Sequence, residues 1–242
     1  GRGAAAAAAA AGAAAWAAQV GVHGAAQCKA VADPKKRDPA PKSLPELTLH
    51  LNVKGRQVFL FGRIDDELAR QVIQVLMYLE QDSPGAPIHM NISSNGGGVQ
   101  AGLAIHDVMQ SITSPVHTLC VGHCESMAAV LLAAGAPGER AAMPHARVMI
   151  HQPVRSAGTA NARQMDIHTR SIEKSRLVLS RILAARTGRP VAEIERLIEY
   201  DYVCDAEEAL ELGLIDRIVA PGGLALAAAD GAPEPGAVPP RP

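Results

Sequence analysis

Two residues of the sequence have the types and settings that nucleophilic catalysis needs. Ser126 follows an apolar segment, 116–121, through an expected turn at 122–125 and precedes an Ala- and Leu-rich helix. His151 follows the apolar run 148–150, so it would emerge at the end of a strand. A neutral imidazole within hydrogen-bond reach of a serine hydroxyl can act as its general base, provided that a carboxylate orients the other ring nitrogen.

Four acidic residues beyond the next long helical segment could supply that carboxylate. They are Glu195, Glu199, Asp201 and Asp205. Asp201 lies in the tetrapeptide Tyr-Asp-Tyr-Val, where polar sequence gives way to an apolar pair, so we expect it to be the partly buried one. Position along the chain leaves all four open.

Each of these residues also has an ordinary structural explanation. A serine that opens a helix is often only its N-cap, and a histidine at a strand end is often a satisfied structural group. A zinc site formed by Cys120, His123 and Cys124 is a further alternative, although this spacing fits no structural zinc pattern.

Three consecutive glycines offer backbone chemistry. Gly96, Gly97 and Gly98 follow the segment 88–93 and precede a helix, so their N–H groups could point at an anion or a developing oxyanion. The segment is not a phosphate loop, because no Gly-Lys-Ser/Thr follows, and its glycine spacing differs from the dinucleotide fingerprint. A tight strand-to-helix turn is the structural alternative.

The elements that must position these residues alternate between two hydrophobic periods. Strands are expected at 47–53, 58–61, 88–93, 116–121, 148–150 and 214–219. Helices are expected at 68–79, 101–112, 127–134 and 206–212, with a long one that ends at Gly188 and Pro190. Strands that alternate with helices predict an α/β domain.

The two ends of the chain differ in composition from the middle. Residues 1–45 are an Ala-rich segment, acid-free before Asp33, followed by a Pro-rich linker. We expect a leader that targets a plastid or mitochondrion, with a bacterial cytoplasm or plain low-complexity sequence as alternatives. No run approaches the about 20 apolar residues of a membrane span. Residues 221–242 are again Ala-, Gly- and Pro-rich, so the folded domain is expected at 46–220.

The composition excludes two classes of function. The 242 residues include 23 Lys and Arg against 24 Asp and Glu, which is too little positive charge for a general nucleic-acid or membrane-surface binder. Four cysteines form no CxxC pair, which favours reduced thiols. We expect no metal and no organic cofactor, and no Walker loop for ATP is found in the sequence.

Three segments resemble a known family, the proteolytic subunit of the ATP-dependent Clp protease. Residues 144–153, PHARVMIHQP, preceded by Gly-Glu-Arg at 138–140, are similar to its histidine signature. Residues 118–129, TLCVGHCESMAA, resemble its serine signature. The segment 194–216 resembles the stretch that carries the acid, and the resemblance assigns that acid to Asp201.

The resemblance implies a ClpP/crotonase-like fold with a β–α spiral core and a protruding handle helix, here 159–186. It implies two stacked heptameric rings, homomeric or mixed. An AAA+ Clp ATPase would bind ATP, unfold protein substrates and feed them into the chamber.

The resemblance also implies a role for each site residue. Ser126 would attack a peptide carbonyl, His151 would take and return the proton, and Asp201 would hold the imidazole. The N–H groups of Gly97 and Met127 would stabilise the oxyanion.

Four positions depart from the usual pattern of that family. Glu125 places a carboxylate beside Ser126, where a small residue is usual, and Asn95 replaces a customary proline beside the glycines. His89 and Asn91 stand where aromatic residues usually line a pocket for loops of the ATPase, so docking would be altered.

Two other functions stay open at this point. A catalytically weak or silent structural subunit of a mixed Clp ring would carry the same signatures. An acyl-CoA enzyme of the crotonase kind would share the fold and use backbone N–H groups on a thioester oxyanion. The Ser/His/Asp set argues against that enzyme, since its class needs no such triad.

Overall fold

The computed structural model describes residues 43–154 and 158–223. The leader and most of the linker expected within 1–45, and most of the tail expected at 221–242, lie outside the described residues. Within the described ranges, no helix has the length and apolar character to cross a membrane. The same ranges contain no group of three His, Cys, Asp or Glu side chains that could hold a metal ion.

The described residues form a seven-stranded sheet, most of it parallel. In spatial order, its main path is β1 (Gln57–Phe61), β2 (Ile88–Ser94), β3 (Val116–Glu125), β4 (Arg140–Ala142) and β7 (Arg217–Ile218). Off this path, β5 (Arg147–Ile150) pairs parallel with β3, and β6 (Tyr202–Cys204) pairs antiparallel with β5. The expected α/β class is confirmed.

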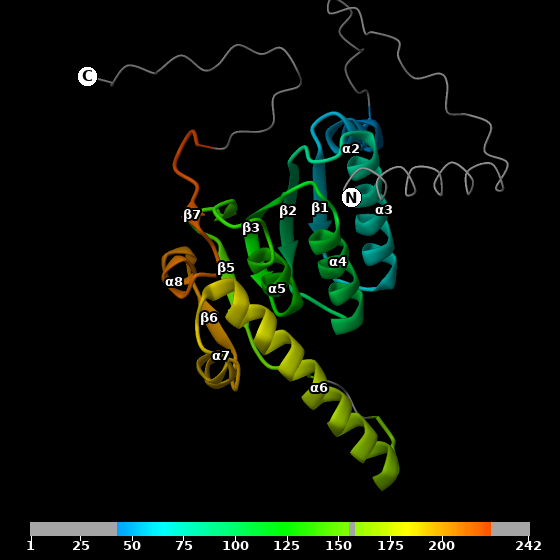
Figure 1. Cartoon of the computed structure of the whole chain (residues 1–242), viewed down its shortest axis with the longest axis vertical. Helices are drawn as coiled ribbons and strands as arrows, with labels where there is room; N and C mark the ends of the chain where they lie inside the picture. The colour runs from blue at the N-terminus through cyan, green and yellow to red at the C-terminus, as the bar shows by residue number, and fades with distance from the viewer. Residues whose placement is uncertain (1–42, 155–157, 224–242) are drawn as a thin grey trace, which may run out of the picture. The chain divides into compact units, whose positions relative to one another are not determined.

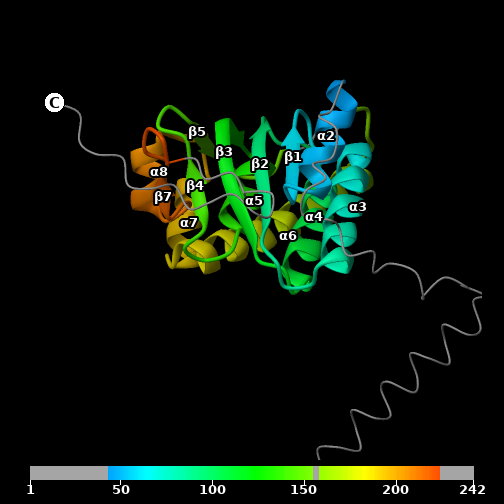
Figure 2. The same cartoon turned by 90° about the horizontal axis from the view of Figure 1, so that it is seen from above.

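Helices connect these strands, and Figure 2 shows α3, α4 and α6 on one face of the sheet. The helices are α2 (Leu44–Val53), α3 (Asp66–Asp82), α4 (Val99–Ser111), α5 (Met127–Ala133), α6 (Ala162–Thr187), α7 (Val191–Leu197) and α8 (Ala206–Leu212). Along β2, buried residues alternate with half-buried ones. Ile88, Met90 and Ile92 of this strand therefore belong to the core, where they are at most 1% exposed.

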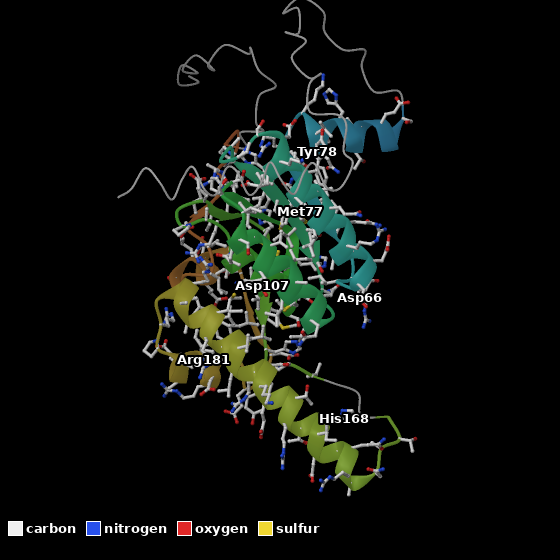
Figure 3. The ribbon with its side chains drawn as sticks, turned by 45° about the vertical axis from the view of Figure 1, so that its right-hand side comes forward. Asp66, Met77, Tyr78, Asp107, His168 and Arg181 are labelled. Carbon is white, nitrogen blue, oxygen red and sulfur yellow. The ribbon has the colours of Figure 1, made fainter. Side chains whose placement is uncertain are left out.

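The long helix expected from the sequence is α6. Asn161 and Gln164 form a capping box at its start, and Gly188 ends it in the left-handed conformation. Its buried residues all lie in the C-terminal half. The N-terminal half extends beyond the sheet (Figure 1), with His168 on the extended part and Arg181 nearer the sheet (Figure 3).

The strand predicted at 47–53 from alternating leucines is wrong, because this segment belongs to α2. The Ser43 side chain caps the helix by accepting a hydrogen bond from the N–H of Glu46 at 3.4 Å. Pro45 lies in the first turn, where the fixed φ of proline suits a helix start. These start signals prevail over a short alternating pattern.

The turn predicted at 122–125 is also wrong, because β3 continues to Glu125. Gly122 has a φ of +86°, which glycine adopts without strain. The strand changes neighbours at this point: residues 118–120 pair with β4, whereas residues 123–125 pair with β5. This change brings the end of β3 beside the end of β5.

The remaining differences concern short elements. β4, β6 and α7 were not predicted, and the last strand, expected at 214–219, is restricted to Arg217–Ile218. Segments of two or three strand residues are too short to display a hydrophobic period.

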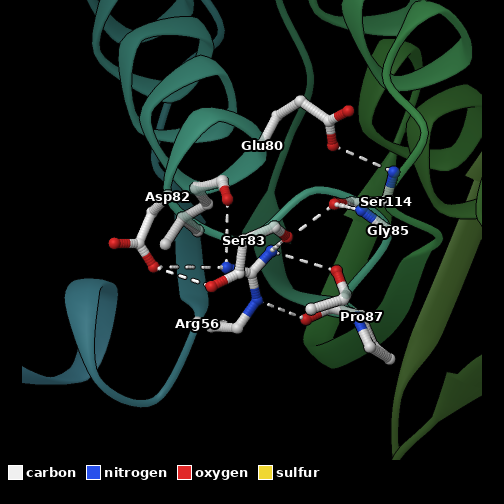
Figure 4. Close-up of polar contacts among 9 residues, drawn as sticks. Arg56, Glu80, Asp82, Ser83, Gly85, Pro87 and Ser114 are labelled. Carbon is white, nitrogen blue, oxygen red and sulfur yellow. Dashed lines mark hydrogen bonds and ion pairs between the residues drawn. The ribbon is translucent and has the colours of Figure 1, made fainter. Parts of the chain in front are cut away.

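Arg56 and Glu80 fix the carboxyl end of α3 (Figure 4). The Arg56 guanidinium donates hydrogen bonds of 2.9–3.3 Å to the carbonyl oxygens of Leu79, Ser83, Ala86 and Pro87. Glu80 accepts from the backbone N–H groups of Thr113 and Ser114, each at 3.0 Å. Hydrogen bonds from Ser114 and Thr113 lower the pKa of Glu80 to about 2.

Candidate active site

Ser126 occupies the turn between β3 and α5. Its backbone has a φ of 55° and a ψ of −123°, a conformation that costs a residue with a Cβ on the order of 1–3 kcal/mol. Its N–H donates to the carbonyl oxygen of Met149 on β5 at 2.8 Å. Ser126 occupies the N-cap position of α5, but its side chain makes no capping hydrogen bond to that helix, so capping does not explain the serine.

The side chain of Ser126 instead contacts His151. The Nε2 atom of His151 lies 2.9 Å from the Oγ atom of Ser126. This contact follows from the strand register, because Glu125 at the end of β3 is paired with Met149 near the end of β5. Residues that follow the two strands therefore meet at the same edge of the sheet.

Asp201 completes a chain of hydrogen bonds. Its Oδ1 atom lies 3.1 Å from the Nδ1 atom of His151. Asp201 directly precedes β6, whose pairing places Tyr202 opposite Ile150, the residue before His151. A proton on Nδ1 would leave Nε2 as the acceptor for the Ser126 hydroxyl.

The other acidic candidates have different contacts. Glu195 faces Arg176 at 4.0 Å, and the Asp205 side chain caps α8. The backbone carbonyl oxygen of Glu199 accepts from the side chain of Gln152 at 3.0 Å. Of the four, Asp201 is the one whose carboxylate meets the imidazole.

The expectation that Asp201 is partly buried is wrong. Its side chain is 71% exposed, whereas that of His151 is 17% exposed. The reason is the topology, because β6 pairs only with β5 in the described part of the chain and so forms an edge of the sheet.

The loop after β2 packs against the Ser126 turn. A Cβ added to Gly96 would lie 2.7 Å from the Cβ of Ser126 and 3.0 Å from the backbone N of Met127. The N–H groups of Gly96 and Gly98 are bound by the Ser94 side chain at 3.0 Å and the Ile64 carbonyl at 2.7 Å.

The two predicted oxyanion donors lie beside the nucleophile candidate. Gly97 lies between Gly96 and Gly98, whose N–H groups are both hydrogen-bonded. Met127 is the first residue of α5, so its N–H has no partner within that helix. Gly97, Met127, Ser126 and His151 line a single pocket.

A comparison with protein families finds a match. The family model for the Clp protease matches residues 47–222, which include every residue of the site. The chain belongs to the Clp protease family. The resemblance carried by residues 118–129 and 144–153 is thereby confirmed, and the α/β structure with its parallel sheet agrees with the fold of the Clp peptidases.

Most of the residues that line the pocket beside Ser126 in this Clp peptidase domain have apolar side chains. Besides the four residues above, it is lined by Val99, Val130, Ile150, Pro153, Val154, Leu179 and Leu183. The contribution of Leu179 and Leu183 to this pocket is not predicted from the sequence. Their spacing of one helical turn is a signal for a shared face of α6, but it does not reveal which element that face meets.

Buried thiols lie on the strands that carry the site. Cys120, Cys124 and Cys204 are free and buried. Burial raises the pKa of Cys204 to about 12 and that of Cys124 well above its ordinary value. Cys124 and Cys204 therefore stay protonated at neutral pH and pack as apolar side chains.

Proposed function

We propose that this chain is a serine endopeptidase subunit of an ATP-dependent Clp protease and that it hydrolyses unfolded proteins to short peptides. The hydrogen-bond chain from Ser126 through His151 to Asp201 carries the proposal. His151 would accept the hydroxyl proton as Oγ attacks the peptide carbonyl carbon, and would return it to the leaving amine. Asp201 would orient the imidazole and stabilise its protonated form.

The N–H groups of Gly97 and Met127 would donate to the carbonyl oxygen as negative charge develops on it. Support comes from their position in the pocket that Ser126 also lines. The apolar lining of that pocket would favour substrates with an apolar side chain next to the cleaved bond. A second water-dependent step, again with His151 as base, would release the peptide from Ser126.

The same proposal includes an AAA+ Clp ATPase partner and two stacked heptameric rings, homomeric or mixed. ATP would be used by the partner, and the peptidase step itself would need no cofactor or metal. Exposed apolar side chains on α3 support contacts with other subunits or partners. Met77 and Tyr78, labelled in Figure 3, are 58% and 49% exposed. We propose no nucleic-acid or membrane partner.

Docking of the ATPase is proposed to involve a polar surface. A pocket over β1, β2 and β3 includes Gln57, His89, Asn91, His117, Glu139 and Arg217 among its lining residues. His89 and His117 stack edge to face with ring centres 5.1 Å apart, and burial lowers the pKa of His89. The expected location, a plastid or mitochondrion rather than a bacterial cytoplasm, depends only on the composition of residues 1–45.

A silent structural subunit is the competing proposal, and the exposure of Asp201 favours it. A carboxylate that is 71% exposed is well solvated, so it orients and stabilises an imidazolium less strongly than a buried one.

Proteolysis by the assembled protein distinguishes the two proposals. The wild type, supplied with an AAA+ Clp ATPase and ATP, should convert a labelled unfolded protein to short peptides, and Ser126→Ala should not. Ser111→Ala is the matched control and should retain activity, since within the described residues the Ser111 hydroxyl donates to the Asp107 carbonyl on α4, away from the site. Equal proteolysis by wild type and Ser126→Ala, or none by either, would favour the silent subunit.

A further inference from the structure

Asn95 and Glu125 flank the candidate active site and are joined by a hydrogen bond. Asn95 directly precedes Gly96, and Glu125 directly precedes Ser126. The Nδ2 atom of Asn95 lies 2.7 Å from the Oε2 atom of Glu125. The residues just before them are the last register pair of β2 and β3. The side-chain bond thus extends the connection between these strands beyond their backbone pairing.

The glycine loop and the Ser126 turn pack against each other and leave no space for a Cβ on Gly96. A Cβ added to Gly96 would lie 2.6 Å from the carbonyl oxygen of Glu125 and 2.7 Å from the Cβ of Ser126. A small displacement of the loop therefore moves Gly97 relative to Ser126. Oxyanion donors must lie within about 2.7–3.1 Å of the charged oxygen, so such a displacement weakens transition-state binding.

Different contacts hold the two sides of the loop. On one side, the Ile64 backbone accepts from the N–H of Gly98 at 2.7 Å and donates to the carbonyl oxygen of Gly96 at 2.9 Å. On the side of Ser126, the bond between Asn95 and Glu125 is the only side-chain hydrogen bond found, within the described ranges, between residues 95–98 and 125–127.

The strained backbone of Ser126 needs support from both neighbouring strands. Its positive φ of 55° is retained only if the surroundings fix it. The hydrogen bond from its N–H to the Met149 carbonyl, at 2.8 Å, provides this support from β5. Glu125 and Asn95 provide the corresponding link to the loop after β2.

We propose that Asn95 and Glu125 form a positioning pair that fixes the oxyanion loop against the Ser126 turn. This inference rests on the proposed peptidase function. Both residues act through the spacing between Gly97 and Ser126, and neither is a catalytic residue. Loss of the pair should therefore lower kcat for a short peptide and leave KM nearly unchanged.

The test compares variants of the assembled full chain with a fluorogenic peptide that carries an apolar residue before the cleaved bond. Asn95→Ala and Glu125→Ala should each lower kcat by about tenfold. The kcat of the double variant should be no lower than that of the less active single variant, because both changes remove the same hydrogen bond. Glu125→Gln keeps an acceptor oxygen and should stay within about threefold of wild type. Glu67→Ala breaks a comparable carboxylate contact with Arg70 on the surface of α3 and serves as the control.

The rate of fluorophosphonate labelling separates failure of this inference from failure of the proposed function. Slower labelling of Asn95→Ala and Glu125→Ala, with wild-type melting temperatures, supports the positioning pair. Wild-type labelling rates in both variants would overturn the inference and leave the peptidase proposal intact. Equal losses in Glu125→Gln and Glu125→Ala would also overturn it. A wild-type protein that is not labelled would overturn the proposed function and, with it, the positioning pair.

Discussion

The two strands that pair with different halves of β3 carry polar clusters built in opposite ways. On β4, Arg140 is 7% exposed. Its guanidinium donates to both carboxylate oxygens of Asp216, at 2.6 and 2.9 Å, and to the carbonyl oxygens of Ala133 and Arg186. Beyond β5, His151 has a single contact on each ring nitrogen, and Asp201 is 71% exposed.

The difference separates a cluster that satisfies its buried charges from one whose proposed role is chemical. The guanidinium of buried Arg140 donates hydrogen bonds to a carboxylate and to carbonyl oxygens. Loss of the carboxylate or of the guanidinium would therefore leave the other charge unpaired. Around His151, each ring nitrogen has a single contact, and Ser126, the proposed nucleophile, has a strained backbone. Stability should therefore depend on the first cluster and activity on the second.

Replacement of Ser126 should give the largest effect on activity. Ser126→Ala should lower kcat for a short peptide by at least about 10⁴-fold, while the free energy of unfolding changes by less than about 0.5 kcal/mol. Ser126→Gly should be equally inactive but more stable by about 1 kcal/mol, because glycine adopts the positive φ without strain. Denaturant unfolding and peptide hydrolysis measure both quantities. A large loss of stability in Ser126→Ala would contradict the assignment of stability to the cluster around Arg140 and of activity to the cluster around His151.

Replacement of Arg140 should give the largest effect on stability. Arg140→Met should lower the free energy of unfolding by about 3–5 kcal/mol, because the Asp216 carboxylate loses its partner. The Arg140→Met/Asp216→Leu double variant should regain part of this loss, since no unpaired charge remains. Titration with denaturant checks both variants. Unchanged stability, or a specific loss of kcat in the folded protein, would contradict the structural role.

Replacement of Asp201 should lower activity less than replacement of Ser126. A buried triad aspartate replaced by asparagine costs about 10⁴-fold in kcat. Because Asp201 is exposed, we expect a smaller loss in Asp201→Asn, about 10²-fold, with little change in unfolding free energy. Steady-state kinetics over a range of pH measure the loss of kcat. Wild-type kcat in this variant would show that Asp201 does not orient His151.

Glu80 is an intermediate case and should give the smallest effect. It is half-buried and receives several hydrogen bonds, and its pKa in the folded chain is about 2, below the ordinary 4.5. Its stabilising contribution is therefore complete above about pH 4.5 and is lost as the pH falls through about 2. Glu80→Gln should melt at a slightly lower temperature than wild type at pH 7, and this difference should vanish near pH 2. A difference that does not depend on pH would contradict the role of the carboxylate charge.

Local patterns predict much of the fold. The helix expected at 206–212 has the same bounds as α8, because Asp205 and Gly213 mark its ends. Ser126 and His151 could be singled out because each follows an apolar strand. The choice of Asp201 among four acids required the family resemblance, since strand pairing between β5 and β6 is not visible in local sequence.

Other features depend on contacts between distant segments. The sequence does not reveal that β3 changes neighbours at Gly122 or that β6 is an edge strand that leaves Asp201 exposed. Nor does it reveal the bond between Asn95 and Glu125, two residues noted separately as unusual. Each of these features follows from strand register, which local hydrophobic periods do not specify.

The most direct test of the account is intact-mass analysis of the assembled protein after treatment with a fluorophosphonate. We expect one adduct per chain, and none on Ser126→Ala, because the proposed role of His151 is to activate the Ser126 hydroxyl that it contacts. An assembled wild-type protein without an adduct, or an adduct that persists in Ser126→Ala, would contradict the proposed role of Ser126.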